Sequence, residues 1–281
     1  MARRLKLGMV GGGQGAFIGA VHRMAARLDD CFELVAGALS SDPQRAQASA
    51  ADVHLARSYT DWREMARSEG ARDDGIDAVA IVTPNHLHAP VATAFLEAGI
   101  HVICDKPLAV SLAEGEALAQ LARDQRRLFA LTHTYSGYPM VRYARERVEA
   151  GDIGELRVVQ VEYAQDWLAL PLEQSGANKQ AVWRTDPAQS GPAGCLGDIG
   201  THAYHLAGFI TGTLPVALSA DVHTFVPGRR LDDHVQAMLR YANGARGMLM
   251  ASQVAGGAEN ALRLRVYGTK GGIAFDQEEP N

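Results

Sequence analysis

Three observations predict an α/β fold in two parts, a doubly wound parallel sheet followed by a large, mostly antiparallel sheet with helices on one face. Apolar runs alternate with amphipathic stretches over the first ~130 residues. A glycine-rich turn, Gly11–Gly19, joins the first run to the first amphipathic stretch. After about Tyr135, long strand-like runs separated by hairpin signals replace this alternation.

The first part has a βαβα rhythm. Its strand-like runs are Leu5–Val10, Phe32–Leu39, Ala78–Thr83, Ile100–Cys104 and Leu128–Thr132. Between them lie stretches with helical periodicity: Ile18–Leu28, Pro43–Asp52, Tyr59–Ser68, His88–Ala98 and Ser111–Arg126. Ser111 and Glu114 fit a capping box, and Asp42 is an N-cap residue before a first-turn proline. Strands that alternate with helices in this way form parallel sheets.

The second part is organised differently. A helix is predicted over Pro139–Glu149 and a strand over Leu156–Ala164, followed by an irregular stretch from Asp166 to Gly197. A second helix, Ile199–Ile210, leads into the strands Val216–Phe225, Asp233–Tyr241, Arg246–Val254, Ala261–Tyr267 and Gly272–Phe275. The turns Asn243-Gly244 and Lys270-Gly271-Gly272 are hairpin signals, so we expect a mostly antiparallel sheet.

Composition limits the possible functions. Of the 281 residues, 47% are hydrophobic and 21% charged, as in ordinary soluble globular proteins. The net charge of −5 offers no basic surface for nucleic acid, and no apolar run approaches the ~20 residues of a membrane helix. The three cysteines, Cys31, Cys104 and Cys195, are widely spaced, which argues against a disulfide framework or a cysteine-based zinc site. We therefore expect a cytoplasmic protein.

The glycine-rich turn is predicted to bind the pyrophosphate of a nucleotide. Glycines between a strand and a helix let the backbone approach a phosphate at the helix N-terminus. Two spacings fit, because Gly11-x-Gly13 is followed by Ala16 at the usual third position while Gly19 suits a loop with three extra residues. A plain tight turn is the alternative. The predicted cofactor contacts are Gly11, Gly13, Gln14, Ala16, Phe17 and Ile18.

The end of the second strand bears on the choice of cofactor. A carboxylate there would bind the ribose 2′-hydroxyl of NAD, but the strand ends in Ser40 and Ser41, with Arg45 nearby. These groups can accommodate a 2′-phosphate, whereas Asp42 serves either the ribose or the cap of the next helix. We predict NAD or NADP, with a lean to NADP.

Polar residues also follow the fourth strand. Thr83, Asn85 and His88 surround a rigid proline turn and suit the ribose and nicotinamide side of a cofactor. An Asn/Pro turn with a helix-capping residue explains the same residues without a ligand.

The fifth strand stops at Asp105 and Lys106. Open α/β sheets bind their ligands at the carboxyl ends of parallel strands, and an ammonium there can polarise a substrate oxygen. An ordinary ion pair at a strand end is the alternative.

Asp198 and His202 are four residues apart at the start of the second helix of the C-terminal part, so both are predicted to project from one face. A histidine is suited to general-base work near neutrality, and a carboxylate can orient it. The alternatives are a metal site that includes His205 and histidines packed under the sheet. Trp183 and Arg184 offer an aromatic wall and a cation for a polar substrate or the cofactor.

Together these motifs resemble the glucose–fructose oxidoreductase/inositol dehydrogenase/rhizopine-catabolism (Gfo/Idh/MocA) family of nicotinamide-dependent oxidoreductases. The resemblance covers essentially the whole chain. It rests on Gly11–Gly19, Thr83-Pro84-Asn85-x-x-His88, Cys104-Asp105-Lys106-Pro107, His133-x-Tyr135, Gly151-x-x-Gly154, Trp183-Arg184 and Asp198-x-x-x-His202. It implies a Rossmann domain over residues 1–134 and a substrate-binding and oligomerisation domain over residues 135–281, with homodimers or homotetramers formed through the open sheet face.

The resemblance also assigns roles. The family's catalytic lysine, aspartate and histidine fall on Lys106, Asp198 and His202. Beyond the glycine turn, the implied cofactor contacts are Ser40, Ser41, Thr83, Asn85, His88, Asp105, Lys106, Trp183 and Arg184. The implied substrate contacts are Lys106, His133, Tyr135, Asp198 and His202, and no metal is implied. Two features depart from the family: the glycine loop is expanded, and the sequence ends at Asn281, so we expect an incomplete second domain.

We therefore predict an NAD(P)-dependent dehydrogenase that transfers a hydride between its cofactor and a hydroxyl of a sugar, inositol or related polyol. His202 would accept the hydroxyl proton, Lys106 would polarise the reacting oxygen, and Asp198 would orient the histidine. The rivals are a glycosidase that uses NAD for transient oxidation and a non-catalytic sensor of sugar and nucleotide. The complete lysine, aspartate and histidine set argues against the sensor, because a binding module needs no base.

Overall fold

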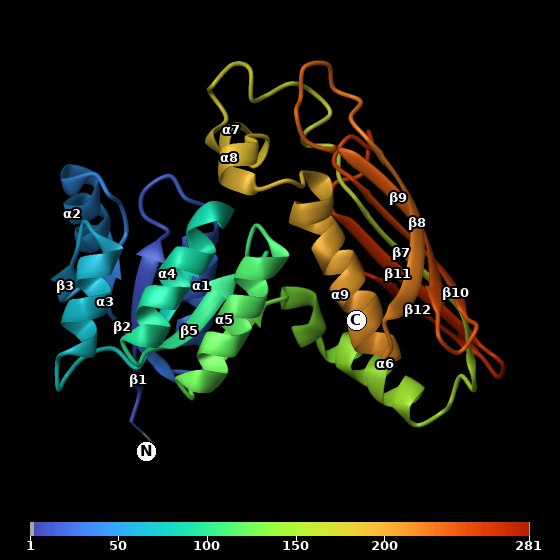
Figure 1. The fold of residues 1–281 in the computed structure, drawn as a ribbon, viewed down its shortest axis with the longest axis horizontal. Coiled ribbons are helices and arrows are strands. Elements are labelled where there is room, and N and C mark those ends of the chain that lie inside the picture. The colour runs from blue at the N-terminus through green and yellow to red at the C-terminus, as the bar shows by residue number, and fades with distance from the viewer. Residues whose placement is uncertain (1–2, 281) are drawn as a thin grey trace. The chain divides into compact units, whose positions relative to one another are not determined.

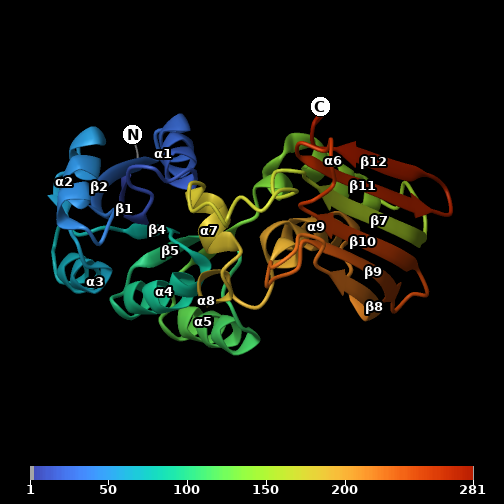
Figure 2. The ribbon, with the colours of Figure 1, turned by 90° about the horizontal axis from the view of Figure 1, so that it is seen from above.

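The computed structural model describes residues 3–280, which form two compact units with a boundary between residues 132 and 133. Each unit contains one six-stranded sheet (Figure 1). Figure 2 shows the two sheets from above, with the chain ends of the described part labelled.

The sheet of the first unit is parallel throughout, with the strand order β3-β2-β1-β4-β5-β6. Its strands are β1 (Leu5–Gly11), β2 (Phe32–Ala38), β3 (Arg57–Ser58), β4 (Ala78–Val82), β5 (His101–Asp105) and β6 (Phe129–Thr132). The helices are α1 (Ile18–Leu28), α2 (Pro43–Asp52), α3 (Trp62–Gly70), α4 (His88–Glu97) and α5 (Leu112–Asp124), with a 3-10 turn over Asn85–Leu87. This order confirms the predicted doubly wound sheet, and the two-residue strand β3 is an addition to it.

Apolar side chains on both faces of this sheet explain why it is doubly wound. Every residue of β4 is buried, as expected for a central strand covered on both sides. One face packs against α3, α4 and α5, which contribute Met65, Phe95 and Leu118 to its core. The other face packs against Ile18 and Ala26 of α1.

Local capping sets the helix starts. The side chain of Asp42 accepts a hydrogen bond from a first-turn N–H at 2.7 Å, and Ser111 does the same at 3.3 Å, as predicted for both caps. Asp61 caps α3 in the same way, at 2.8 Å. The helix therefore starts at Trp62, and the predicted start at Tyr59 was wrong, because the N–H of Tyr59 donates to the carbonyl of Gly37 in β2 at 2.9 Å.

The second unit has the strand order β12-β11-β7-β10-β9-β8, with β7 and β10 parallel and the other neighbours antiparallel. Its strands are β7 (Leu156–Ala164), β8 (Pro215–His223), β9 (His234–Tyr241), β10 (Arg246–Ser252), β11 (Ala261–Gly268) and β12 (Gly272–Asp276). The α-helices are α6 (Pro139–Glu149), α7 (Lys179–Arg184), α8 (Pro187–Ser190) and α9 (Thr201–Thr211). A 3-10 turn covers Thr134–Gly137 and a π-helical turn covers Leu196–Gly200.

Helices α6 and α9 cover one face of this sheet (Figure 1). Alternate residues of β7, such as Val159 and Val161, point to that face and pack against Leu206 of α9. The opposite face carries half-buried and exposed side chains, including Met248 and Met238, the latter 69% exposed. The predicted mostly antiparallel sheet is thereby confirmed.

Two predictions for this unit need correction. The stretch Asp166–Gly197 is not wholly irregular, because it contains the short helices α7 and α8, each started by a side-chain cap. The helix predicted over Ile199–Ile210 begins earlier, as the π-helical turn, and continues as α9 to Thr211. Asp198 lies in the π-helical turn and His202 in the first turn of α9, so the pair spans a junction that is often found at functional sites.

Candidate active site

The glycine-rich turn folds the backbone between β1 and α1 against itself. A Cβ atom on Gly19 would lie 2.4 Å from the Cα of Gly12, so α1 can start here only without a side chain at this position. Gly11 and Gly12 have φ angles of +81° and +74°, which favour glycine. Ala16 closes an inner turn by donating its N–H to the carbonyl of Gly13 at 3.0 Å. The close-packing glycine is therefore Gly19, and the longer loop is the correct interpretation.

Side chains around the turn hold it in place. Nη1 of Arg23 donates to a carbonyl oxygen of the turn at 2.8 Å. Gln14 is tied to α2, because its N–H donates to Oγ of Ser49 at 3.0 Å and its side-chain amide donates to a carboxylate at 2.8 Å. Phe17 is 69% exposed, whereas Ile18 packs against the sheet. The turn thus presents backbone N–H groups at the positive end of α1, where a phosphate is favoured.

The end of β2 offers hydroxyl groups. The hydroxyl of Ser40 accepts a hydrogen bond from the N–H of Asp42 at 3.1 Å, and Ser41 is exposed. The Asp42 carboxylate caps α2, which is the structural role weighed for it from the sequence.

Residues after β4 are more deeply placed. Oγ1 of Thr83 is buried and has no hydrogen-bond partner among residues 3–280, and Asn85 is buried beside it in the chain. His88 is 1% exposed, with Nδ1 2.6 Å from the carbonyl oxygen of Pro107 and Nε2 3.0 Å from that of Thr83. Burial lowers the pKa of His88. A neutral ring carries a single N–H, so it can donate to only one of these two carbonyls.

Asp105 and Lys106 stand at the end of β5. Oδ1 of Asp105 accepts the N–H of Lys106 at 2.7 Å, and Oδ2 lies 3.8 Å from Nε2 of His22 on α1. Burial would raise the pKa of the Asp105 carboxyl, but the contact with His22 and the charge of Lys106 outweigh it and hold that pKa below its usual range. The site thus has a fixed negative charge beside a half-buried ammonium.

These features test whether the first unit fits a dinucleotide. The carboxyl ends of β1, β4 and β5 are neighbours in the sheet, so the glycine turn, Thr83 and Lys106 belong to one edge. A turn that excludes side chains suits a pyrophosphate, and the hydroxyl of Thr83, which has no hydrogen-bond partner within the described part of the chain, suits a polar ligand. The residues present therefore fit a dinucleotide.

In the second unit, rings gather around His202. Its ring centroid lies 5.0 Å from that of Tyr135 and 5.5 Å from that of His133, both edge to face. The ring centroid of Tyr163 lies 6.1 Å from that of His202. His133 in turn stacks on His205 at 4.0 Å, and burial lowers the pKa of His205, so this ring is neutral at pH 7. Three predicted substrate contacts are thus brought together, namely His133, Tyr135 and His202.

The side chains of Arg184 and Gln253 contact the carboxylate of Asp198. Nε of Arg184 lies 3.3 Å from its Oδ2, and Nε2 of Gln253 donates to the same oxygen at 2.9 Å. The guanidinium of Arg184 also lies over the ring of Trp183, 4.3 Å from the centroid. Arg184 was predicted to contact the cofactor; the contact described here is with the carboxylate. Gln253 is 2% exposed and was not among the predicted site residues.

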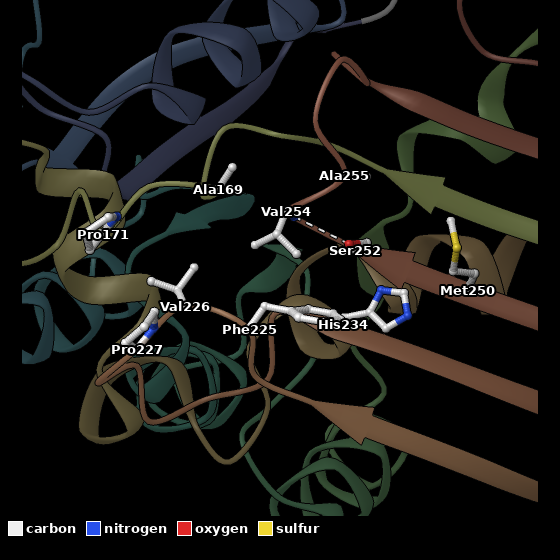
Figure 3. A pocket seen from close by; sticks show the side chains of 10 residues that line it. All are labelled: Ala169, Pro171, Phe225, Val226, Pro227, His234, Met250, Ser252, Val254 and Ala255. Atoms are coloured by element: carbon white, nitrogen blue, oxygen red, sulfur yellow. Dashed lines mark hydrogen bonds between the residues drawn. The ribbon is translucent and has the colours of Figure 1, made fainter.

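Two further observations concern metal-binding groups and a pocket in the second unit. Within residues 3–280, no group of three or more His, Cys, Asp or Glu side chains is arranged to hold a metal ion. A pocket of about 510 Å³ lies in the second unit, lined by apolar side chains such as Phe225, Val226 and Val254 together with His234 and Met250 (Figure 3). None of the predicted site residues lines this pocket.

Comparison with known proteins identifies the lineage of these two units. Residues 5–133 match the model described as "Oxidoreductase family, NAD-binding Rossmann fold", and residues 141–274 match the GFO/IDH/MocA C-terminal domain. The chain belongs to the Gfo/Idh/MocA family. It is an NAD-binding oxidoreductase, which confirms the resemblance, the predicted cofactor class and the predicted enzyme class.

Relatives of the oxidoreductase match it over nearly its whole length. Levoglucosan dehydrogenase from Pseudarthrobacter phenanthrenivorans is 32% identical, covering 98% of this chain and 74% of its own. The crystal structure of an oxidoreductase from Sinorhizobium meliloti is 51% identical with a TM-score of 0.88, covering 100% and 74% of the two chains. An inositol dehydrogenase homolog from Azotobacter vinelandii, complexed with NADH and myo-inositol, is 34% identical with a TM-score of 0.93, covering 100% and 72%.

The predicted catalytic residues of the oxidoreductase lie in different units. Lys106 belongs to the first unit, whereas Asp198 and His202 belong to the second.

No helix in the described residues is both long enough and apolar enough to cross a membrane.

Gln253 escaped prediction because nothing in its local sequence distinguishes it from a residue at the end of a strand. The available signal was its place directly after β10, the strand that pairs with β7 in parallel. A polar residue at that point has to find a partner once it is buried.

Proposed function

We propose that the oxidoreductase oxidises a hydroxyl group of a sugar, an inositol or a related polyol. The observation that carries this proposal is the fixed carboxylate of Asp198, held by Arg184 and Gln253 in the turn that precedes His202. A carboxylate that precedes a histidine by four residues on continuous helical backbone can orient the imidazole and compensate its charge when the histidine acts as a general base.

The roles of the chain's own residues follow from their chemistry. His202 accepts the proton of the reacting hydroxyl, and Asp198 keeps the imidazole oriented and compensates the charge it gains. Lys106, at the end of β5, supplies an ammonium that polarises a substrate oxygen and stabilises negative charge that develops on it. When bound, the nicotinamide supplies the hydride acceptor.

The cofactor is assigned to the first unit. The backbone of the glycine turn and the N-terminus of α1 would hold the pyrophosphate, Ser40 and Ser41 the adenosine ribose, and Thr83 the nicotinamide side. The hydroxyl groups after β2 support acceptance of NADP alongside NAD, because Asp42 already serves as a helix cap.

The substrate class rests on two kinds of support. His133, Tyr135 and His202 offer polar groups set among aromatic rings, a lining suited to a polyhydroxylated ring. The relatives are named for levoglucosan and inositol.

We further propose a cytoplasmic protein, since all three cysteines are free thiols. We also propose a homodimer or homotetramer formed through the open sheet face that carries Met238.

The test is a panel of sugars and cyclitols, including myo-inositol and levoglucosan, assayed with NAD and NADP in parallel at ~340 nm. Reduced cofactor that accumulates with a polyol supports the proposal. Release of an aglycone without net reduction would indicate the glycosidase instead, and tight binding without turnover would indicate a sensor.

Variants of the second unit separate the catalytic role from other roles. Asp198→Asn and His202→Ala should each lower turnover strongly, and the double variant should be little worse than either, because residues that act as a unit are non-additive. Additive losses would contradict the coupled pair. Loss of activity on chelation, with recovery on adding a divalent cation, would indicate a metal site.

A further inference from the structure

A network of hydrogen-bonded side chains lies at the ends of β7, β10 and β11, and it shares Tyr163 with the rings around His202. We call it the inner network; its members are Tyr163, Gln165, Trp167, Gln253 and Asn260. It reaches Asp198 through Gln253 and Tyr135 through Tyr163. The two residues at its ends are both predicted to act on the substrate, so the direction of the hydrogen bonds between them has consequences for the site.

Backbone hydrogen bonds fix the positions of the two glutamines. The N–H of Gln165 donates to the carbonyl of Ser252 at 2.8 Å, and the N–H of Gln253 donates to that of Asp233 at 3.0 Å. The carbonyl of Gln253 also accepts the N–H of Leu168 at 3.1 Å. Both side chains therefore start from fixed backbone, and their amide groups meet with Nε2 of Gln253 3.5 Å from Oε1 of Gln165.

Trp167 sets the direction of the network. An indole N–H can only donate, and Nε1 of Trp167 lies 3.2 Å from Oε1 of Gln165. The oxygen of the Gln165 amide is therefore the acceptor at this end, and its nitrogen must point the other way. That nitrogen donates to Oδ1 of Asn260 at 2.8 Å.

The same direction continues to Tyr135. Oδ1 of Asn260 also accepts the hydroxyl proton of Tyr163 at 2.6 Å. Burial raises the pKa of both tyrosines, so at neutral pH each hydroxyl carries one proton. The proton of Tyr163 is already donated to Asn260. In the 2.5 Å contact between the two hydroxyls, Tyr135 is therefore the donor and Tyr163 the acceptor.

The other end of the network is fixed by charge. An ionised carboxylate only accepts hydrogen bonds, and Arg184 lies 3.3 Å from Oδ2 of Asp198. The amide nitrogen of Gln253 therefore faces this oxygen, at 2.9 Å. This orientation agrees with the one that Trp167 imposes through Gln165, so the Asp198 carboxylate and the Trp167 indole require the same orientation of the two glutamine amides.

We propose that the inner network positions the site by turning the hydroxyl proton of Tyr135 inward, so that Tyr135 offers a substrate only the lone pairs of its oxygen, and that Gln253 positions Asp198. This inference rests on the proposed function. It specifies the substrate further, because the group that meets Tyr135 must be a hydrogen-bond donor, such as a second hydroxyl. An ether or carbonyl oxygen at that place would meet another acceptor.

Neutron diffraction of crystals of the deuterated protein tests the direction of the network without any substrate. We expect deuterium on the Tyr135 hydroxyl directed to the oxygen of Tyr163, deuterium on Tyr163 directed to Asn260, and the deuterated amide of Gln253 facing Asp198. Deuterium of the Tyr163 hydroxyl directed to Tyr135 would overturn the inference, whatever the enzyme's activity.

Kinetics test the positioning roles, with myo-inositol and levoglucosan as probes. Gln253→Met removes the donor to Asp198 and should lower kcat at least about 10-fold, with KM for the cofactor unchanged. Tyr163→Phe releases the proton of Tyr135 and should raise KM for the polyol about 10-fold with little change in kcat. Gln160→Met, the same replacement as the first on the neighbouring strand β7, is the matched control and should leave both constants unchanged.

The possible failures can be told apart. A purely structural role for Gln253 would lower the melting temperature and the folded fraction but leave kcat and KM per folded molecule at parent values, which would overturn its positioning role. An unmodified protein that reduces no cofactor with any polyol of the panel would overturn the proposed function instead, and the deuterium positions would still decide the direction of the network.

Discussion

Gly19→Ala is predicted to weaken cofactor binding by moving the start of α1. The new Cβ would lie 2.4 Å from the Cα and 2.7 Å from the carbonyl oxygen of Gly12, whereas ordinary contacts begin at 3.4 Å. Both obstacles are backbone atoms, so no side-chain rotation can relieve them, and α1 has to withdraw by about 1 Å. Overpacking of this kind costs ~1–3 kcal/mol, and the better helix propensity of alanine returns ~0.5–1 kcal/mol.

The loss of stability is thus about 0–2.5 kcal/mol, small enough for the first unit to stay folded. The effect on the cofactor should be larger, because the withdrawn N–H groups lose charge-assisted hydrogen bonds to phosphate worth ~1.5–3 kcal/mol. We expect the Kd for NADH, measured by fluorescence titration, to rise ~10–100-fold.

Gly15→Ala is the matched control for this prediction. Gly15 lies in the same turn with a φ of +76°, but a Cβ there would meet nothing within 4 Å. It should therefore cost backbone strain of ~1–2 kcal/mol without pushing α1 away. A Kd for Gly19→Ala within twofold of the parent, or an equal loss in both variants, would refute the close packing as the basis of phosphate binding.

Further predictions concern catalysis, cofactor choice, thiols and pH. Lys106→Met should lower turnover roughly 100-fold or more with cofactor affinity retained, and steady-state rates within a few-fold of the parent would remove its role. NADP should bind at least comparably with NAD in parallel titrations; strong discrimination against NADP would place Asp42 on the ribose. Cys31, which is exposed, should react with a thiol reagent in the folded protein, whereas burial raises the pKa of the other two thiols, which should react only on unfolding. The hydrogen bond from Arg3 lowers the pKa of Asp77, so Asp77→Asn should reduce stability in urea at pH 7; this difference should begin to shrink as the pH falls below ~4 and disappear below the lowered pKa of Asp77.

Much of the fold follows from local patterns in the sequence. The helices over Ile18–Leu28, Pro43–Asp52 and Pro139–Glu149 and the strand over Leu156–Ala164 have the predicted bounds. Their starts and ends depend on capping side chains, prolines and apolar periodicity, all of which act within a few residues. The error at the start of α3 is of the same local kind, since Asp61 was an available cap that the prediction passed over.

The candidate site was likewise only partly predictable from the sequence. Lys106 at the end of a buried strand and the spacing of Asp198 and His202 are visible in the sequence, because residue type and spacing can be read without the tertiary structure. Whether Gly19 or Ala16 is the close-packing residue was not visible, because that depends on the distance between α1 and the backbone of Gly12.

The contacts of the polar residues belong to the tertiary structure alone. Gln253 meets Asp198 across 55 residues of sequence, and Gln165 meets Asn260 across 95. Burial obliges each of these groups to find a partner, but the choice of partner is made by the sheet that brings the ends of β7 and β10 together. Local sequence patterns therefore determined the elements and the reactive groups of this protein, whereas strand pairing decided which polar groups meet, because hydrogen bonds act only over a few ångströms.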